Sequence, residues 1–440
     1  LNFYSDVWWD SSVYMGMGKY VFSQGKSGLW EESRPLIFPL IQGIGWLFGA
    51  DTVYYGRIIS IMFSVLVLFI TYKLGEKLFS KKIGLLAAFF TAFSYNFLFF
   101  SPNILTEIPS TFFVLMAFYF FLDNRFFLTG LFSGIAVMTR LFQIFTLIGL
   151  GLGFLVYFYN KPNFYKKSMY IFLGALIVIS PYIILNHYLY KDLAYPFKVQ
   201  AHLTKTTGWM LYKEFPFYIQ GLFKENFFLI FLLLLPFYFR KNAKFITLLL
   251  IPIVYLIIFS IAKHKEMRFM LVILPFIYLL LAYSLSELYR RAPFKRIFLA
   301  FFLLLTTVWL GLTIFSLERE TSKQYHQFDE SFNHFQAYLK GNKGNIWLTN
   351  PLYALYSDAK IDGLLYFYSS ENLIKFINEN ENKVEIILFN SCDMPCPSIE
   401  LDPLCAESRK ILEESLSKHE ILYKKEANNC QYKIFRRAIV

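Results

Sequence analysis

The chain has 440 residues, of which 56% are hydrophobic and only 17% are charged, and its net charge is +12. A soluble domain has roughly 45–50% apolar and about 25% charged residues, so the composition excludes an ordinary soluble enzyme. The apolar residues form long unbroken runs, which exclude a disordered chain and predict helices in contact with lipid. The sequence therefore indicates a polytopic α-helical membrane protein.

The positive charge is unevenly distributed along the chain. Residues 318–440 contain 15 basic and 18 acidic side chains, which leaves 28 basic and 13 acidic ones for residues 1–317. In this first part the Lys and Arg residues lie in short connections between apolar runs, as the positive-inside rule predicts. We therefore expect a lipid bilayer, and no nucleic acid, as the partner of the basic residues.

The chain begins at Leu1 with a polar, aromatic stretch, and residues 1–51 are expected to form the first external loop with interfacial helices. Within it, Pro35–Ala50 is apolar but has only about 16 residues, fewer than a helix needs to cross a bilayer. We predict an interfacial helix there, with a membrane crossing as the alternative. Because both ends are then outside, one further transmembrane helix is expected before Leu1.

Ten apolar runs follow in residues 52–317, the predicted transmembrane domain. They lie at about 52–72, 83–100, 108–122, 126–140, 141–159, 168–188, 226–239, 245–262, 269–287 and 297–316. With the expected extra helix, the full protein would have eleven. Several runs are short for a hydrocarbon core of about 30 Å, which predicts tilted or broken helices.

Alternate connections between these runs are basic. Their residues are Lys73, Lys77, Lys81, Lys82, Arg125, Lys161, Lys166, Lys167, Arg240, Lys241, Lys244, Arg290, Arg291, Lys295 and Arg296. The positive-inside rule places them in the cytoplasm, and the other connections and residues 318–440 outside. The chain is thus predicted to be a multi-pass protein of the cell membrane.

Residues 318–440 have a soluble pattern and predict a small extracytoplasmic α/β domain. Strands are expected at 345–349, 384–389, 421–423 and 432–435, and an amphipathic helix at 407–416. All four cysteines, Cys392, Cys396, Cys405 and Cys430, lie here. Two disulfides on an oxidising face are favoured, with connectivity left open; a metal site is the alternative, because only three residues separate Cys392 from Cys396.

Charged residues collect at the outer ends of the predicted spans, where burial in lipid costs about 2.5–3.5 kcal/mol or more. They are Arg57, Glu107, Arg140, His264, Lys265 and Arg268. Each alone is also explained by a lipid headgroup contact or a helix cap. Together they predict an outward-facing basic pocket with a few carboxylates, as a membrane-embedded phosphate would require.

Two acidic residues of the first loop, Asp6 and Asp10, lie among aromatic residues such as Trp8, Trp9 and Tyr14. Aromatic residues at a membrane interface are normal anchors. A carboxylate flanked by aromatic rings is equally suited to hold and deprotonate a sugar or another hydroxyl substrate. Both interpretations stand at this point.

Several short motifs occur in a characteristic order. They are Trp9–Tyr14 with Asp10 and Tyr14, Arg34–Pro39, Gly56–Ser60 with Arg57, Leu74–Phe79, Thr106–Pro109 with Glu107, and Gly134–Arg140. In this set the chain resembles the polyprenyl-phosphate-dependent glycosyltransferases of the C-type fold, specifically glycosyltransferase family 39, the protein mannosyltransferase and lipid A aminoarabinose transferase group. Ser11 stands where this group usually has Glu. The segment His264–Phe269 looks instead like a motif found in the related endoplasmic-reticulum mannosyltransferases.

The resemblance implies transfer of a sugar from a polyprenyl phosphate, dolichyl or undecaprenyl, to an acceptor hydroxyl outside the cytoplasm, with Asp10 as the catalytic base and inversion at the anomeric carbon. The acceptor would be a protein, a lipid or a glycan. Arg57, Arg140, His264, Lys265 and Arg268 would bind the donor phosphate, and Glu107 would assist Asp10. Tyr14, Asp6, His202 and Trp209 are candidates for lining the sugar site.

No cofactor is firmly implied. Asp10 and Glu107 could contribute to a divalent cation site, but a hard cation prefers more oxygen ligands, so we expect no metal. The alternatives to this function are a transporter or channel for a polar or anionic solute, and a transferase of a whole oligosaccharide or lipid headgroup.

Overall fold

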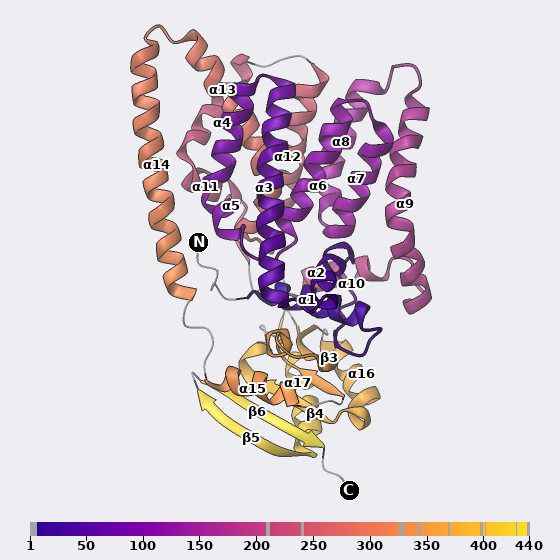
Figure 1. Ribbon diagram of the computed structural model, residues 1–440. Coiled ribbons are helices and arrows are strands. Elements are labelled where there is room, and N and C mark those ends of the chain that lie inside the picture. Colours follow the sequence, from indigo (N-terminus) through magenta and orange to yellow (C-terminus); the bar gives the residue numbers. More distant parts are fainter. Residues whose placement is uncertain are drawn as a thin grey trace.

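The computed structural model describes residues 7–207, 212–238, 242–324, 330–341, 345–367, 370–396, 399–400, 402–427 and 429–437. A bundle of helices forms one part of the molecule, and a mixed α/β unit covers one end of it (Figure 1). Two residues with a predicted role, Asp6 and Trp209, lie outside the described residues.

Within the described residues, four helices are long and apolar enough to span a membrane. They are α3 (Thr52–Leu78), α9 (Phe164–Tyr190), α12 (Ala243–Ile261) and α14 (Lys295–Gln324). A fifth candidate is the pair α11 (Phe217–Glu225) and η1 (Phe227–Tyr238), which meet at 107°. The shorter apolar helices of the bundle are α6 (Glu107–Leu122), α7 (Phe126–Thr139) and α8 (Gln143–Phe158).

Two predicted spans are broken in the structure. The run 83–100 forms α4 (Lys81–Ala92) and α5 (Tyr95–Phe100), because the Ser94 hydroxyl accepts a hydrogen bond from the Phe97 backbone N–H and starts a new helix. The run 269–287 begins as a 3₁₀ helix, η2 (Met267–Val272), and continues as α13 (Leu274–Arg291). Pro275 in the first turn of α13 explains this restart, since proline lacks the N–H that a continuous helix would use.

The outer surface of the bundle is apolar, and its centre is packed with aromatic rings. Large side chains such as Phe69 on α3, Ile177 on α9 and Phe301 on α14 are exposed. A surface of this kind is unfavourable in water and suits lipid, so the prediction of a multi-pass membrane protein is confirmed. The helix α13 is buried along most of its length and lies at the centre of the packing.

Two helices precede the bundle: α1 (Trp9–Phe22) and α2 (Ile37–Leu47). They approach each other closely, because a Cβ atom on Gly18 would lie 2.6 Å from the Pro39 carbonyl oxygen. The 11 residues of α2 span about 16 Å, about half of a hydrocarbon core. Both helices lie at the end of the bundle that faces the α/β unit (Figure 1). The position of α2 at the membrane surface stays a prediction.

The α/β unit contains a six-stranded sheet of order β1-β3-β2-β4-β6-β5. Its strands are β1 (Gly28–Leu29), β2 (Ile346–Leu348), β3 (Lys360–Leu364), β4 (Ile386–Asn390), β5 (His419–Ala427) and β6 (Cys430–Arg437), and its helices are α15 (Glu330–Gly341), α16 (Ser370–Asn380) and α17 (Cys405–Ser417). The predicted α/β fold is confirmed. The sequence reading missed β3, which carries polar residues, and the two-residue strand β1.

The strand β1 comes from the first loop of the chain and pairs in parallel with β3. Gly28 has a φ of +81° there, a conformation that favours glycine. A segment near the N-terminus is therefore an edge strand of a sheet whose other strands begin more than 300 residues later. The first loop and the α/β unit form one packed body.

The cysteines form two disulfides, Cys392–Cys430 and Cys396–Cys405. The prediction of two disulfides is confirmed, and the structure supplies the connectivity. Both bridges involve the segment after β4: one ties it to the start of β6, and the other ties it to the start of α17. They thus fix three elements of the unit to one another.

We expect the two bridges to differ in their contribution to stability. Sequence separations of 38 and 9 residues correspond to loop-closure contributions of about 4 and about 3 kcal/mol to the free energy of unfolding. Replacing Cys392 and Cys430 by Ala should therefore lower the unfolding temperature of the α/β unit more than replacing Cys396 and Cys405. Calorimetry of the purified protein, with and without reductant, measures both effects; equal losses would contradict this ranking.

Candidate functional site

A network of carboxylates and guanidinium groups lies where the first loop meets the bundle. Its carboxylates are Asp10, Glu31, Glu107 and Glu266, and its guanidinium groups are Arg34, Arg140 and Arg268. We call these seven residues the ion-pair network. They come from α1, the segment before α2, the start of α6, the end of α7 and the start of η2 with the residue before it.

Asp10 stands in the first turn of α1, one turn before Tyr14. Residues four apart lie on one face of a helix, so both side chains face the same neighbours. One carboxylate oxygen of Asp10 accepts a hydrogen bond of 2.7 Å from Arg34, and the other accepts one of 2.5 Å from Arg268. Two cations therefore hold the two oxygens of one carboxylate.

These cations control the proton affinity of Asp10. Burial raises the pKa of this carboxyl, but the charges and hydrogen bonds of Arg34 and Arg268 outweigh burial and hold the pKa well below its usual range. In the arrangement described, Asp10 is firmly ionised and a poor proton acceptor. A catalytic base at this position must first lose one of its cations.

Arg34 uses its whole guanidinium group in the network. Its Nη2 donates to Asp10, its Nη1 donates to the Tyr14 hydroxyl at 2.8 Å, and its Nε donates to Glu31 at 2.7 Å. The sequence places Arg34 in the motif Arg34–Pro39 but does not predict its role in the network. The sequence feature that could have indicated this role is the position of Arg34 directly before the apolar run of α2, in a loop rich in charged residues.

Glu107 lies in the first turn of α6 and is only 1% exposed. Its Oε1 lies 2.8 Å from Nη1 of Arg140 and 3.5 Å from Nε of Arg268. Within the described part of the chain, Oε2 of Glu107 has no hydrogen-bond partner. A buried carboxylate oxygen without a donor is costly, so this atom is available to a group that a substrate brings.

Arg268 contacts three carboxylates. Besides Asp10 and Glu107, its Nη2 donates to Glu266 at 2.8 Å. The same oxygen of Glu266 lies 2.9 Å from Nε2 of His264. Burial raises the pKa of the Glu266 carboxyl, but the hydrogen bonds and charges of His264 and Arg268 outweigh burial, so the pKa lies below its usual value. The charged run 263–268 contains Glu266, but the sequence does not predict its role in the network.

The remaining predicted residues have other surroundings. Lys265 is buried, and its ammonium group donates to the Lys213 carbonyl oxygen at 2.7 Å. Arg57 is buried near the start of α3 and acts electrostatically on Tyr356 of the α/β unit. His202 is exposed on α10 (Tyr195–Thr207). The structure thus brings Asp10, Tyr14, Glu107, Arg140 and Arg268 together, with His264 at the edge.

The ion-pair network is not strongly basic. Four carboxylates face three guanidinium groups, so the formal charges of these seven residues sum to −1. The sequence predicts a basic pocket with a few carboxylates, and the structure places four carboxylates beside these arginines. The arginines are already neutralised by carboxylates of the protein.

No cluster of three or more His, Cys, Asp or Glu side chains suited to a metal ion occurs within the described ranges. Arg268 lies between Asp10 and Glu107, at the place where a shared cation would have to bind. The expectation that the site works without a metal stays a prediction.

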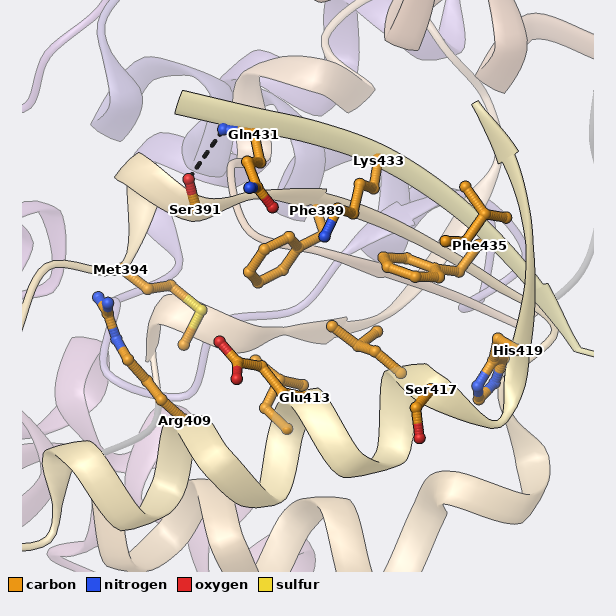
Figure 2. A pocket seen from close by; sticks show the side chains of 13 residues that line it. Phe389, Ser391, Met394, Arg409, Glu413, Ser417, His419, Gln431, Lys433 and Phe435 are labelled. Atoms are coloured by element: carbon orange, nitrogen blue, oxygen red, sulfur yellow. Dashed lines mark hydrogen bonds between the residues drawn. The ribbon is translucent and has the colours of Figure 1, made fainter. Parts of the chain in front are cut away.

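A separate cavity of about 370 Å³ lies in the α/β unit, between α17 and strands β4, β5 and β6 (Figure 2). Phe389, Leu412 and Phe435 form its apolar wall, and Arg409 and Lys433 lie at its rim. None of the seven residues of the ion-pair network lines it. This cavity is therefore not part of the site at Asp10.

Comparisons with known proteins agree on the fold. Residues 33–185 match the family model described as dolichyl-phosphate-mannose-protein mannosyltransferase. Among solved structures, ArnT from Cupriavidus metallidurans bound to undecaprenyl phosphate is similar with a TM-score of 0.67 and 10% identity, over 100% of this chain and 95% of that chain. No curated protein matches the sequence significantly.

Two further structures are similar at low identity. The archaeal oligosaccharyltransferase AglB from Archaeoglobus fulgidus, in complex with an inhibitory peptide and a dolichol-phosphate, has a TM-score of 0.59 and 13% identity, over 96% of this chain and 70% of that chain. The arabinofuranosyltransferase AftD from Mycobacteria has a TM-score of 0.53 and 11% identity, over 98% of this chain and 40% of that chain.

The fold and the helices define the class: this is a multi-pass membrane protein with the C-type glycosyltransferase fold. Within that class, the match over residues 33–185 confirms the resemblance to the polyprenyl-phosphate-dependent group of family 39 that the sequence motifs predicted.

The depressed pKa of Asp10 predicts a specific pH dependence of stability. Because the folded pKa lies below the usual value of about 3.9, ionised Asp10 stabilises the fold above that value, and the contribution is lost as the pH falls through the folded pKa. The unfolding temperature of Asp10→Asn should therefore lie furthest below that of the parent near pH 7. The gap should shrink below about pH 4.

Differential scanning fluorimetry in detergent between pH 3 and pH 7 measures this gap. Asp192→Asn is the matched control: Asp192 pairs with the exposed Lys198 and its pKa is also lowered, but it lacks the two buried cations of Asp10, so its gap should be much smaller than that of Asp10→Asn. A gap for Asp10→Asn that stays constant over the whole pH range would contradict the assignment.

Proposed function

We propose that the protein is an inverting glycosyltransferase that moves a sugar from a polyprenyl phosphate to an acceptor hydroxyl, with Asp10 as the general base. The observation that carries this proposal is the position of Asp10, between Arg34 and Arg268 and close to the buried Glu107. The family match over residues 33–185 and the fold shared with ArnT and AglB support the donor class.

The donor phosphate is expected to bind at Arg268 and Arg140. A guanidinium group matches two phosphate oxygens, as it matches two carboxylate oxygens. Arg268 is shared among three carboxylates, so it can exchange one of them for phosphate and keep the others. As the bond between the anomeric carbon and the phosphate oxygen breaks, negative charge grows on the phosphate, and both arginines stabilise it. A separate general acid is not required.

This exchange also activates the base. When Arg268 turns from Asp10 to the phosphate, Asp10 loses one of the two charges that depress its pKa. Its carboxylate then takes the proton of the acceptor hydroxyl while that oxygen attacks the anomeric carbon from the side opposite the phosphate. A new carbon–oxygen bond forms, the polyprenyl phosphate leaves, and the configuration inverts.

The other residues of the network then have distinct roles. Arg34 stays on Asp10 and keeps the carboxylate oriented, because its remaining nitrogens are bound to Tyr14 and Glu31. Glu107 holds Arg140 and Arg268 with Oε1, and its unpaired Oε2 is placed to accept a hydrogen bond from a sugar or acceptor hydroxyl.

We place this reaction on the outer face of the membrane. The α/β unit with its two disulfides lies at the end of the bundle where Asp10 lies, and the basic connection between α13 and α14 lies at the opposite end (Figure 1). Disulfides persist in oxidising compartments, and basic connections stay in the cytoplasm.

The central test is sugar transfer from a panel of polyprenyl-phosphate sugars in liposomes. Loss of a general base should lower kcat of Asp10→Asn at least about 100-fold, while the donor still binds. Arg268→Ala should weaken donor binding as well as kcat. Arg290→Ala is the matched control for the arginine, because Arg290 pairs with Glu287 at the other end of the bundle, and it should turn over like the parent.

Three results would change this proposal. Unchanged turnover of Asp10→Asn would remove Asp10 as the base. Transfer of an intact oligosaccharide or headgroup would keep the site and change the substrate. Solute or ion flux through the liposomes without any donor binding would favour the transporter.

A reporter fusion tests the orientation. Alkaline phosphatase, which folds only in an oxidising compartment, should be active when fused after Val440 and inactive when inserted in the connection between Arg291 and Lys295. The reverse pattern would place Asp10 on the cytoplasmic face.

A further inference from the structure

One residue of the α/β unit reaches the surroundings of Asp10. Tyr366, in the short 3₁₀ helix η4 (Leu365–Phe367), donates a hydrogen bond of 2.9 Å from its hydroxyl to Oε2 of Glu31. Its ring packs edge-on against Trp9, the neighbour of Asp10 in the chain, with centroids 4.2 Å apart. Tyr366 is separated from Asp10 by more than 350 residues in sequence and by two hydrogen-bonded side chains in space.

The two intervening side chains form a continuous series of hydrogen bonds. Glu31 is only 3% exposed, and its Oε1 accepts hydrogen bonds from Nε of Arg34 and from the Ser33 hydroxyl. Arg34 in turn donates to Asp10. The Tyr366 hydroxyl is therefore the donor for the remaining oxygen of a buried carboxylate, which would otherwise lack a partner at considerable cost.

The helix that carries Asp10 is attached to the same unit at a second place. Lys19, near the end of α1, is buried, and its ammonium group donates to the Ser357 carbonyl oxygen at 2.9 Å and lies 3.2 Å from Asp358. Beyond α1, strand β1 joins the edge of the sheet. The α/β unit thus holds α1 near its end and Arg34 through Glu31.

We propose that the α/β unit is part of the catalytic site and that Tyr366 is its positioning residue, which acts on Asp10 through Glu31 and Arg34. Arg268 is shared and free to exchange partners, whereas Arg34 is fixed because Tyr366 and Ser33 fix Glu31. Detaching the unit from this series of contacts removes the fixed cation of the base without removing any group that touches the substrate. This inference rests on the function proposed above.

The test removes one hydroxyl. Tyr366→Phe keeps the ring on Trp9 and deletes the donor to Glu31. We expect kcat to fall about tenfold, less than the roughly 100-fold that a misplacement of about 1 Å costs, because Arg34 keeps its own bond to Asp10, while KM for the donor changes less than about twofold. The matched control is Tyr353→Phe: this hydroxyl donates to Asp393 within the same unit, and its loss should leave kcat within about twofold of the parent.

A double-mutant cycle separates positioning from a general loss of structure. In a Glu31→Gln background, Tyr366→Phe should lower kcat less than about twofold, because the route to Arg34 is already altered. Equal effects of Tyr366→Phe in both backgrounds, or an equal loss in Tyr353→Phe, would overturn the inference. So would full activity of Tyr366→Phe, and in that case the proposed function would stand.

A structural measurement covers the case in which the parent transfers no sugar. That result would refute the proposed function, and a cryo-EM structure of the full-length Tyr366→Phe protein would then decide on the positioning. Arg34 displaced from Asp10 supports the inference. Arg34 unmoved, with its hydrogen bond to Asp10 intact, overturns it.

Discussion

The rest of the site depends on one electrostatic constraint: a carboxylate, Asp10, is held at the junction of the bundle and the α/β unit. A charged group taken out of water must be paired, and Asp10 is paired with two guanidinium groups. Each guanidinium then needs further carboxylates, which come from the segments around 31, 107 and 266. The positions of the first loop, α6, α7 and η2 relative to one another follow from satisfying this single series of charges.

The two arginines on Asp10 differ in how they are held, and this difference gives the site its proposed chemistry. Arg34 has one partner for each of its nitrogens, and its second carboxylate is itself anchored to the α/β unit. Arg268 divides its charge among three carboxylates, one of them at 3.5 Å. An incoming anion competes more easily for the divided cation. In the proposed mechanism, Asp10 therefore keeps its orientation through Arg34 and changes its proton affinity through Arg268.

The site residues that could be predicted from the sequence are those that stand out from their immediate neighbours in the chain. Asp10, Glu107 and Arg140 lie at the ends of helices in an apolar chain, where an ionised side chain is energetically costly and therefore indicates a functional site. Glu31 and Tyr366 carry no such signal: one lies in a polar loop, and the other lies in a soluble unit in which tyrosine is ordinary. Their roles depend on contacts between residues far apart in the chain. Strand β1 likewise forms only by pairing with the distant β3, and its two residues are too few to show a strand periodicity in the sequence. Helix positions followed from hydropathy, whereas the breaks at Ser94 and Pro275 depend on single residues inside apolar runs.

Charge balance favours exchange over simple addition when a donor binds. The described network already has four carboxylates for three guanidinium groups, so a phosphate added without any rearrangement would increase an existing excess of negative charge. If phosphate replaces a carboxylate on Arg268, the displaced carboxylate must be neutralised, and a proton is the simplest means. That proton is available from the acceptor hydroxyl, and Asp10 is the carboxylate that the exchange releases. In the proposed mechanism, binding of the donor and deprotonation of the acceptor are thus linked by Arg268, and the excess negative charge of the network explains why catalysis would require both substrates.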